Sequence, residues 1–283
     1  MTKSNFFVLA VLFIIVTFAF YIVGGIFPAK LNTTGAQGGA YVLVTPKPGN
    51  PKQGLQLELV KLKGCSSTTT VDFLIDRSGS MAYGKKLSSL QTGVLSFVNK
   101  LSDQSIFGLQ SFSQQGTAKG EWSNDINPDL FSSVKGKITD VICSIHPDGG
   151  TYTKNAFEKT KTVLADTKNR FPDRKLVLIF ISDGVPETIE SDRACIPEDC
   201  RANSCACFAP EQDPTSVANE IKTDLGVKIY SIAYLDVKDE KLTGKLEAMM
   251  KRVASSESNY YRAPNETDII QILNLIGNEI CSE

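Results

Sequence analysis

The alternation of short apolar segments with amphipathic segments, which runs from residue 68 nearly to the end, most constrains the fold of this chain. The run Leu176–Ser182 is too short for an average helix and suits a strand buried on both faces. Between such runs, apolar residues recur at helical spacing, and one stripe consists of Leu87, Leu90, Val94, Val98 and Leu101. The pattern predicts an α/β fold in which a mostly parallel, doubly wound sheet carries helices on both faces.

The same pattern places the individual elements. We expect strands at Thr70–Asp76, Ile106–Phe112, Gly116–Trp122, Leu176–Ser182, Val227–Leu235 and Asn259–Arg262. We expect helices at Asp129–Ile145, Lys154–Arg170, Thr215–Leu225 and Leu242–Ala254, and a closing helix with Ile269, Ile272, Leu273, Ile276 and Ile280 on one face. Two strand-like runs, Tyr41–Thr45 and Leu55–Leu62, flank a turn-rich segment, which predicts a hairpin-like extension at 41–64 ahead of a main domain at 65–283.

A long apolar segment precedes these elements. Phe6–Phe27 contains no charged residue, and about 22 helical residues at ~1.5 Å each span a hydrocarbon core of roughly 30 Å. We expect an uncleaved transmembrane signal anchor after a tail at 1–5, since a cleaved signal peptide, the alternative, has an apolar region of about 7 to 15 residues. A pilin-like amino terminus fits poorly, because no glycine precedes Phe6 and Ala10 stands where an acid is needed. Residues 28–40 are small, polar and glycine-rich, as in a flexible linker.

Charge and cysteine content exclude some functions and favour one compartment. The formal net charge is -1, so no basic field draws the chain to nucleic acid, and nucleic-acid binding is not expected. The one histidine, His146, excludes multi-histidine metal sites, and we interpret it as a loop residue. Seven cysteines indicate an oxidising compartment, so we expect a single-pass membrane protein whose globular part lies on the extracytoplasmic side.

Three oxygen-rich turns are placed so that they meet at one edge of the predicted sheet. The first strand ends in the sequence DRSGS, which puts Asp76, Ser78 and Ser80 on one side of a turn. Thr151 precedes a predicted helix and Asp183 follows the most buried strand, so both reach the same edge. Carboxylates and hydroxyls are hard ligands that suit Mg²⁺, Mn²⁺ or Ca²⁺ and not zinc. Each turn alone could be a helix cap or a simple turn, but together they predict a divalent metal site.

These residues resemble the metal ion-dependent adhesion site (MIDAS) of von Willebrand factor type A domains, which consists of a D-x-S-x-S turn, a distant threonine and a distant aspartate. All five positions of that site are filled in this sequence. The resemblance covers about residues 68–281 in order and spacing, apart from a cysteine-rich insertion at 185–213. It implies a six-stranded sheet between helices, with Mg²⁺ bound at its top. We therefore expect a role in cell adhesion or protein binding, in which an aspartate or glutamate of a protein ligand coordinates the ion, with Asp148 and backbone amides at the rim.

The cysteines predict disulfide bonds at both ends of the domain. Cys65 precedes the first strand and Cys281 ends the closing helix, so both lie at the end opposite the metal, where a bond between them is geometrically natural. In some members of the resembled family this helix slides to change the metal affinity, so such a bond implies a largely fixed affinity. We expect further bonds within the insertion and one from it to Cys143, with one thiol left over. The insertion supplies Cys195, Cys200, Cys205 and Cys207, whose spacing fits the alternative of a zinc site poorly.

Two other functions stay open at this point. An assembly factor that docks onto an ATPase or a membrane complex would use the same face, and a cytoplasmic domain with reduced cysteines would favour it. A hydrolase with Asp76 or Ser78 as its nucleophile would have no general base other than the ligating carboxylates. We therefore expect a binding protein and not an enzyme.

Overall fold

The computed structural model describes residues 41–43, 59–61, 69–114, 117–187, 209–235 and 240–282. The chain divides into two compact units, Met1–Lys61 and Leu62–Glu283. In the first unit, β1 (Tyr41–Leu43) and β2 (Leu59–Lys61) pair antiparallel, within the two strand-like runs of the sequence. No helix among the described residues is long and apolar enough to cross a membrane, and Phe6–Phe27 lies outside that part, so the anchor stays a prediction.

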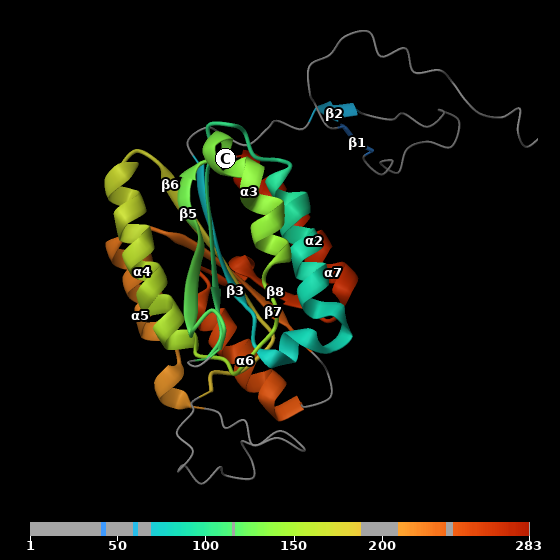
Figure 1. The fold of residues 1–283 in the computed structure, drawn as a ribbon, viewed down its shortest axis with the longest axis vertical. Coiled ribbons are helices and arrows are strands. Elements are labelled where there is room, and N and C mark those ends of the chain that lie inside the picture. Colours follow the sequence, from blue (N-terminus) through green and yellow to red (C-terminus); the bar gives the residue numbers. More distant parts are fainter. Residues whose placement is uncertain are drawn as a thin grey trace, which may run out of the picture. The chain divides into compact units, whose positions relative to one another are not determined.

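The second unit is built on a six-stranded sheet with the order β5-β4-β3-β6-β7-β8 (Figure 1). Its strands are β3 (Thr69–Asp76), β4 (Ile106–Phe112), β5 (Trp122–Leu130), β6 (Lys175–Ser182), β7 (Lys228–Tyr234) and β8 (Tyr260–Ala263). All neighbouring strands are parallel except β4 and β5, which are antiparallel. The α/β fold with a mostly parallel sheet is therefore confirmed.

Helices cover both faces of this sheet (Figure 1). One layer consists of α2 (Lys86–Val98), α3 (Phe131–Cys143) and α7 (Glu266–Ser282), and the other of α4 (Thr153–Arg170), α5 (Thr215–Asp224) and α6 (Glu240–Val253). Each layer forms one buried apolar cluster with its face of the sheet. The rings of Phe73 and Phe97 meet edge to face at 5.2 Å in one cluster, and those of Phe157 and Phe180 at 4.8 Å in the other. Close packing on both faces fixes the positions of the strand ends.

One strand differs from the expectation. We predicted a strand at Gly116–Trp122, but β5 begins only at Trp122 and occupies the residues that follow. The helix predicted from Asp129 therefore begins two residues later, as α3. The sequence of β5, WSNDINPDL, is mostly polar, and only Ile126 and Pro128 are buried. Asparagine, aspartate and proline usually indicate turns, but an edge strand tolerates them because it pairs along one side only.

A carboxyl group lies in the middle of the sheet. Asp72 of β3 is fully buried, and its Oδ1 accepts a hydrogen bond from Nε2 of Gln110 at 2.9 Å. Gly108 of β4 leaves room for it, because a Cβ there would lie 2.4 Å from Oδ1 of Asp72. Burial raises the pKa of Asp72 to about 8, although hydrogen bonds from Gln110 and the backbone of Phe73 oppose the rise. The folded protein therefore holds Asp72 largely protonated at neutral pH.

β3 and β6 lie side by side at the centre of the sheet. They pair in parallel from Thr69 with Lys175 to Ile75 with Ile181, so both strands end at the same edge. Asp76 is the last residue of β3, and Ser182 is the last residue of β6. The turns that follow the two strands are therefore neighbours in space although they lie far apart in the sequence.

Candidate metal centre

Asp76 lies at the end of β3 and is fully buried. Its Oδ1 accepts a hydrogen bond from the backbone N–H of Ser78 at 2.7 Å, which closes the turn after the strand. Its Oδ2 accepts one from the hydroxyl of Ser182 at 2.6 Å, which ties the turn to β6. Each oxygen of the carboxylate is therefore held in place by a bond to a different strand end.

Ser78, Ser80 and Asp183 form a hydrogen-bonded chain beside Asp76. The hydroxyl oxygens of Ser78 and Ser80 lie 3.0 Å apart, and the Ser80 hydroxyl donates to Oδ1 of Asp183 at 2.7 Å. Ser78 and Asp183 are buried and Ser80 is half-buried. The fold thus brings four of the five predicted ligands into one hydrogen-bonded cluster, although Ser80 and Asp183 are 103 residues apart.

The loop that carries Thr151, the fifth predicted ligand, is fixed to the same edge by its backbone. The N–H of Gly79, in the turn after β3, donates to the carbonyl of Gly149 at 2.8 Å. On the other side, the N–H of Glu187 donates to the carbonyl of Thr151 at 2.9 Å. Thr151 is itself buried. Backbone bonds therefore join its loop both to the turn after β3 and to the segment that follows Asp183.

Two carboxylates lie close together at this edge, and each affects the other. Burial and the charge of Asp183 raise the pKa of Asp76 to about 7, against hydrogen bonds from Ser182 and Ser78 that favour the charged form. Within the described residues, no group of three or more His, Cys, Asp or Glu side chains is placed to hold a metal ion. An ion at this edge would depend on two carboxylates and the neighbouring hydroxyls, a hard oxygen donor set that fits Mg²⁺, Mn²⁺ or Ca²⁺.

One contact of the cluster was not anticipated from the sequence. Lys86, the first residue of α2, donates from Nζ to Oδ2 of Asp183 at 2.7 Å, and the two side chains are 9% and 0% exposed. Because Ser80 occupies the other oxygen, both oxygens of Asp183 have a partner. A lysine in the first turn of a helix lies unfavourably in the field of the helix dipole, and this position is the sequence signal that could have indicated a special role.

Gly149 keeps the Thr151 loop close to the end of β4, and we expect its replacement to weaken the site. Gly149 has a φ of +73°, and a Cβ there would lie 2.6 Å from Cγ2 of Thr117 and 2.8 Å from Cβ of Gln114. We expect Gly149→Ala to lower the free energy of unfolding by about 1 to 3 kcal/mol. Because the loop must shift, the affinity for Mg²⁺ should fall roughly tenfold. Urea unfolding and calorimetric titration measure the two effects.

Gly136→Ala is the matched control for this change. Gly136 lies in α3, and a Cβ there would meet nothing within 4 Å. The control should keep the Mg²⁺ affinity and gain a little stability from the higher helix propensity of alanine. Equal affinities in the two alanine variants would show that the loop does not position Thr151 for the ion.

The other predicted loop residues lie close by. Asp148, expected at the rim, is exposed, and its N–H donates to the carbonyl of Arg77 at 2.7 Å. His146 is exposed in the loop after α3, as interpreted from the sequence. Asp148 is thus the exposed carboxylate in the loop that leads to Thr151, whereas the two acids of the cluster are buried.

The expected bond from the insertion to Cys143 is corrected by the structure. Cys143 is a free, exposed cysteine. It is the last residue of α3, a helix that turns Val134, Ile138 and Ile142 into the core and leaves Cys143 on its outer side. The thiol therefore faces solvent.

The other predicted cysteine pairings are only partly covered by the structure. Cys281 lies near the end of α7 and is 9% exposed. Five cysteines lie outside the described residues, namely Cys65, Cys195, Cys200, Cys205 and Cys207. The bond between Cys65 and Cys281 and the bonds within the insertion therefore stay predictions, which peptide mapping without reduction would check.

Comparison with known proteins gives the following matches. The sequence profile of the von Willebrand factor type A domain matches residues 71–275. No curated protein matches the sequence. Among solved structures, the pilus adhesin SpaC from Lactobacillus rhamnosus GG in its open conformation shares 21% identity with a TM-score of 0.59, over 75% of this chain and 30% of that chain. The vWF domain of the type V pili tip protein Mfa5 from Porphyromonas gingivalis shares 14% identity with a TM-score of 0.56, over 75% of this chain and 94% of that chain.

A further solved structure bears on the metal. Proximal thread matrix protein 1 from the mussel byssus, described with a zinc-occupied MIDAS motif, shares 18% identity with a TM-score of 0.52, over 77% of this chain and 49% of that chain. This chain spans about a third of the length of the adhesin SpaC and about half of the byssus protein. At these identities the likeness establishes a shared fold.

Proposed function

Because the chain belongs to the von Willebrand factor type A domain family, we propose that it binds a protein ligand through a divalent metal ion held by Asp76, Ser78, Ser80, Thr151 and Asp183. The observation that carries this proposal is the buried hydrogen-bonded cluster of two aspartates and two serines at the ends of β3 and β6. The hard oxygen donors favour Mg²⁺, and Mn²⁺ or Ca²⁺ could replace it.

The residues of the cluster have separate tasks in this function. Asp76 and Asp183 supply the negative charge that attracts the ion, and the hydroxyls of the serines and of Thr151 supply neutral oxygen donors. When bound, the ion offers an open coordination position to a carboxylate oxygen of the partner. The two carboxylates neutralise a dication only if both ligate it directly. Where one of them is held back behind a water molecule, the ion would keep positive charge and attract an aspartate or glutamate of the ligand. We propose that Asp148, which is exposed in the loop that leads to Thr151, contacts the ligand at the rim.

We further propose that Phe6–Phe27 anchors the chain in a membrane and that the domain faces the extracytoplasmic side. The length and apolarity of that segment and the number of cysteines support this location. Proteins with a similar fold include one described as a pilus adhesin and one described as a pilus tip protein. A surface role in adhesion or protein binding agrees with the use of the fold in those proteins.

A binding role fits the site better than a catalytic one. A hydrolase with Asp76 or Ser78 as nucleophile would have no general base in the cluster other than the carboxylates that would ligate the ion. In the cluster, Asp76 accepts bonds from Ser78 and Ser182, and Asp183 accepts bonds from Ser80 and Lys86. We therefore propose that the carboxylates hold an ion and do not act on a substrate.

The proposed function predicts capture of a protein partner that depends on the ion. The full chain in mild detergent is immobilised and incubated with solubilised cell-surface proteins in Mg²⁺ or in EDTA. We expect at least one protein, identified by mass spectrometry, to bind in Mg²⁺ and to be lost in EDTA, because its carboxylate has no other anchor in the site. Replacing the aspartates and glutamates of that partner one at a time should identify a single residue whose loss abolishes capture.

Two outcomes would count against this reading. Binding that persists unchanged in EDTA would show that the ion is not needed. Recovery of a cytoplasmic ATPase or of a membrane complex as the specific partner would support the assembly role instead of adhesion. Calorimetric titration of the same protein with Mg²⁺, Mn²⁺, Ca²⁺ and Zn²⁺ identifies the preferred ion.

A further inference from the structure

We propose that Lys86 is an internal cation that competes with the divalent ion for Asp183. The inference rests on the proposed function, because it concerns the same site. Lys86 donates to Oδ2 of Asp183 at 2.7 Å, and the two side chains are 9% and 0% exposed. Water therefore screens this ion pair weakly, and the charge of the ammonium group acts strongly on Asp183 while the two are in contact.

The charge of Lys86 works against the binding of a dication. With the ammonium in place, the formal charge carried by Asp76, Asp183 and Lys86 is about -1, and without it about -2, because each ionised group contributes one charge. A dication on Asp183 would also face the ammonium group across the same carboxylate, and the repulsion between them is strong where both are buried. The ammonium group must therefore be displaced for the ion to bind tightly, and this displacement lowers the apparent affinity.

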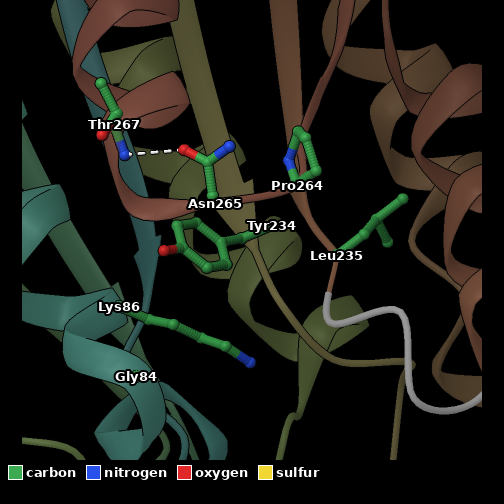
Figure 2. Close-up of a pocket in the computed structure, with 7 residues that line it drawn as sticks. All are labelled: Gly84, Lys86, Tyr234, Leu235, Pro264, Asn265 and Thr267. Carbon is green, nitrogen blue, oxygen red and sulfur yellow. Dashed lines mark hydrogen bonds between the residues drawn. The ribbon is translucent and has the colours of Figure 1, made fainter.

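The structure offers the ammonium group a second position. A cavity of about 400 Å³ adjoins the side chain and is lined by Gly84, Lys86, Tyr234, Leu235, Pro264, Asn265 and Thr267 (Figure 2). Figure 2 shows Lys86 extending alongside the ring of Tyr234, and Nζ lies 5.6 Å from the centre of that ring. An aromatic face attracts a cation at this distance, and the flexible stem of lysine allows a shift of a few ångströms. Lys86 faces Tyr234 while it is bound to Asp183, so on release from Asp183 it can stay against this ring and move into the cavity.

The cavity also places the exchange next to the start of α7. Asn265, one of its lining residues, accepts hydrogen bonds from the N–H groups of Thr267 and Asp268 at 3.0 and 3.1 Å, and so caps this helix. Tyr234, at the end of β7, is 3% exposed. An ammonium group that moves into this space would therefore change the surroundings of the cap, and the resonances of Tyr234 and Asn265 should report its arrival.

Substitutions of Lys86 separate its charge from its size. Lys86→Met keeps an unbranched side chain of similar length but removes the charge, and Lys86→Arg keeps the charge. We expect Lys86→Met to bind Mg²⁺ at least about tenfold more tightly than the unchanged protein, because the competing cation is gone. Lys86→Arg should stay within about threefold of the unchanged protein, since an arginine remains charged at every accessible pH. Calorimetric titration of the full chain in detergent measures all three affinities.

A control variant removes a different ion pair whose carboxylate is also buried. Lys119 contacts Asp125 at 2.7 Å, and the two side chains are 30% and 2% exposed. Lys119→Met loses a lysine–aspartate pair that does not include Asp183 and should leave the Mg²⁺ affinity unchanged. Without metal, Lys86→Met should melt at a lower temperature than the unchanged protein, because buried Asp183 loses its charged partner and keeps only Ser80. Addition of Mg²⁺ should therefore raise its melting temperature more than that of the unchanged protein.

A spectroscopic readout follows the ammonium group directly. In protein labelled with ¹⁵N at the lysine side chains, the signal of Lys86 is the one missing from Lys86→Met. We expect this signal to shift on titration with Mg²⁺, together with the ring resonances of Tyr234, while the signal of Lys119 stays in place. A Lys86 signal that does not respond while Mg²⁺ binds would overturn the proposal.

The outcomes separate this inference from the proposed function. If the unchanged protein and Lys119→Met bind Mg²⁺ and Lys86→Met binds it equally or more weakly, the competition is refuted and the metal site stands. If none of the proteins binds or is stabilised by a divalent ion, the proposed function fails, and the competition fails with it. Tighter binding by Lys86→Met alone, with a moving Lys86 signal in the unchanged protein, supports both.

Discussion

Asp76→Asn is expected to lower the affinity for Mg²⁺ by at least about 100-fold, the upper end of the losses seen when residues around metal ligands are changed. The substitution removes one of the two carboxylates of the cluster and leaves a neutral amide of the same shape. Calorimetric titration of the full chain in detergent measures the affinity. Protein capture that depends on Mg²⁺ should be lost in parallel.

The same substitution should stabilise the protein in the absence of metal. Burial and the charge of Asp183 raise the pKa of Asp76 to about 7, so above that pH the folded chain holds an unfavourable negative charge at this position. An asparagine removes this charge, and the melting temperature in EDTA at pH 8 should rise. Loss of binding together with a gain in stability would distinguish a damaged site from a damaged fold.

Asp72→Asn is the control for this experiment. Asp72 lies on the same strand as Asp76 and is equally buried, but its carboxyl group bonds to Gln110 in the middle of the sheet. Its variant should bind Mg²⁺ as the unchanged protein does. If both variants lost the ion, the loss at position 76 could not be assigned to the edge of the sheet, and an unaltered affinity in Asp76→Asn would refute the metal site.

The second large effect concerns stability and its dependence on pH. Burial raises the pKa of Asp72 from an ordinary value of 3.8 to about 8. Between these two values the folded chain retains a proton that the unfolded chain has lost, so the free energy of unfolding falls as the pH rises. Each pKa unit corresponds to about 1.4 kcal/mol, so the fall between pH 5 and pH 8 is about 4 kcal/mol.

Asp72→Asn removes this titration, because an amide binds no proton in this range. The difference in unfolding free energy between the variant and the unchanged protein should therefore grow by about 4 kcal/mol from pH 5 to pH 8, in favour of the variant. Urea unfolding in EDTA at several pH values measures it. The titration of the other groups is the same in both proteins and cancels when the two unfolding free energies are subtracted. If the difference stayed constant from pH 5 to pH 8, it would contradict the raised pKa of Asp72.

The strands and helices with a clear period were predictable from local sequence. A strand was expected at Leu176–Ser182 and is observed at Lys175–Ser182, and the helix expected at Lys154–Arg170 is observed at Thr153–Arg170. The position of β5 was not predictable in this way. Its residues are those usually found in turns, and it forms a strand because it pairs with β4. An edge strand is defined by the strand beside it.

The candidate ligands were also predictable, for a topological reason. Parallel strands end at one edge of a sheet, so polar residues directly after two such strands reach the same edge. The sequence alone therefore determined that Asp76, Ser78, Ser80 and Asp183 would lie at one edge, and the pairing of β3 with β6 brings them into contact. Thr151 was placed at this edge because it precedes a helix, and backbone bonds hold its loop to the turn after β3.

Only the tertiary structure decided which charges surround these residues. Lys86 lies 97 residues from Asp183, and its ammonium group reaches that carboxylate because α2 packs against the sheet at this edge. Asp72 is tolerated inside the sheet because Gly108 and Gln110 of the adjacent strand give it space and a hydrogen bond. Periodicity specifies which face of an element is buried, but the partner of a buried charge is set by the packing of elements that are distant in the sequence.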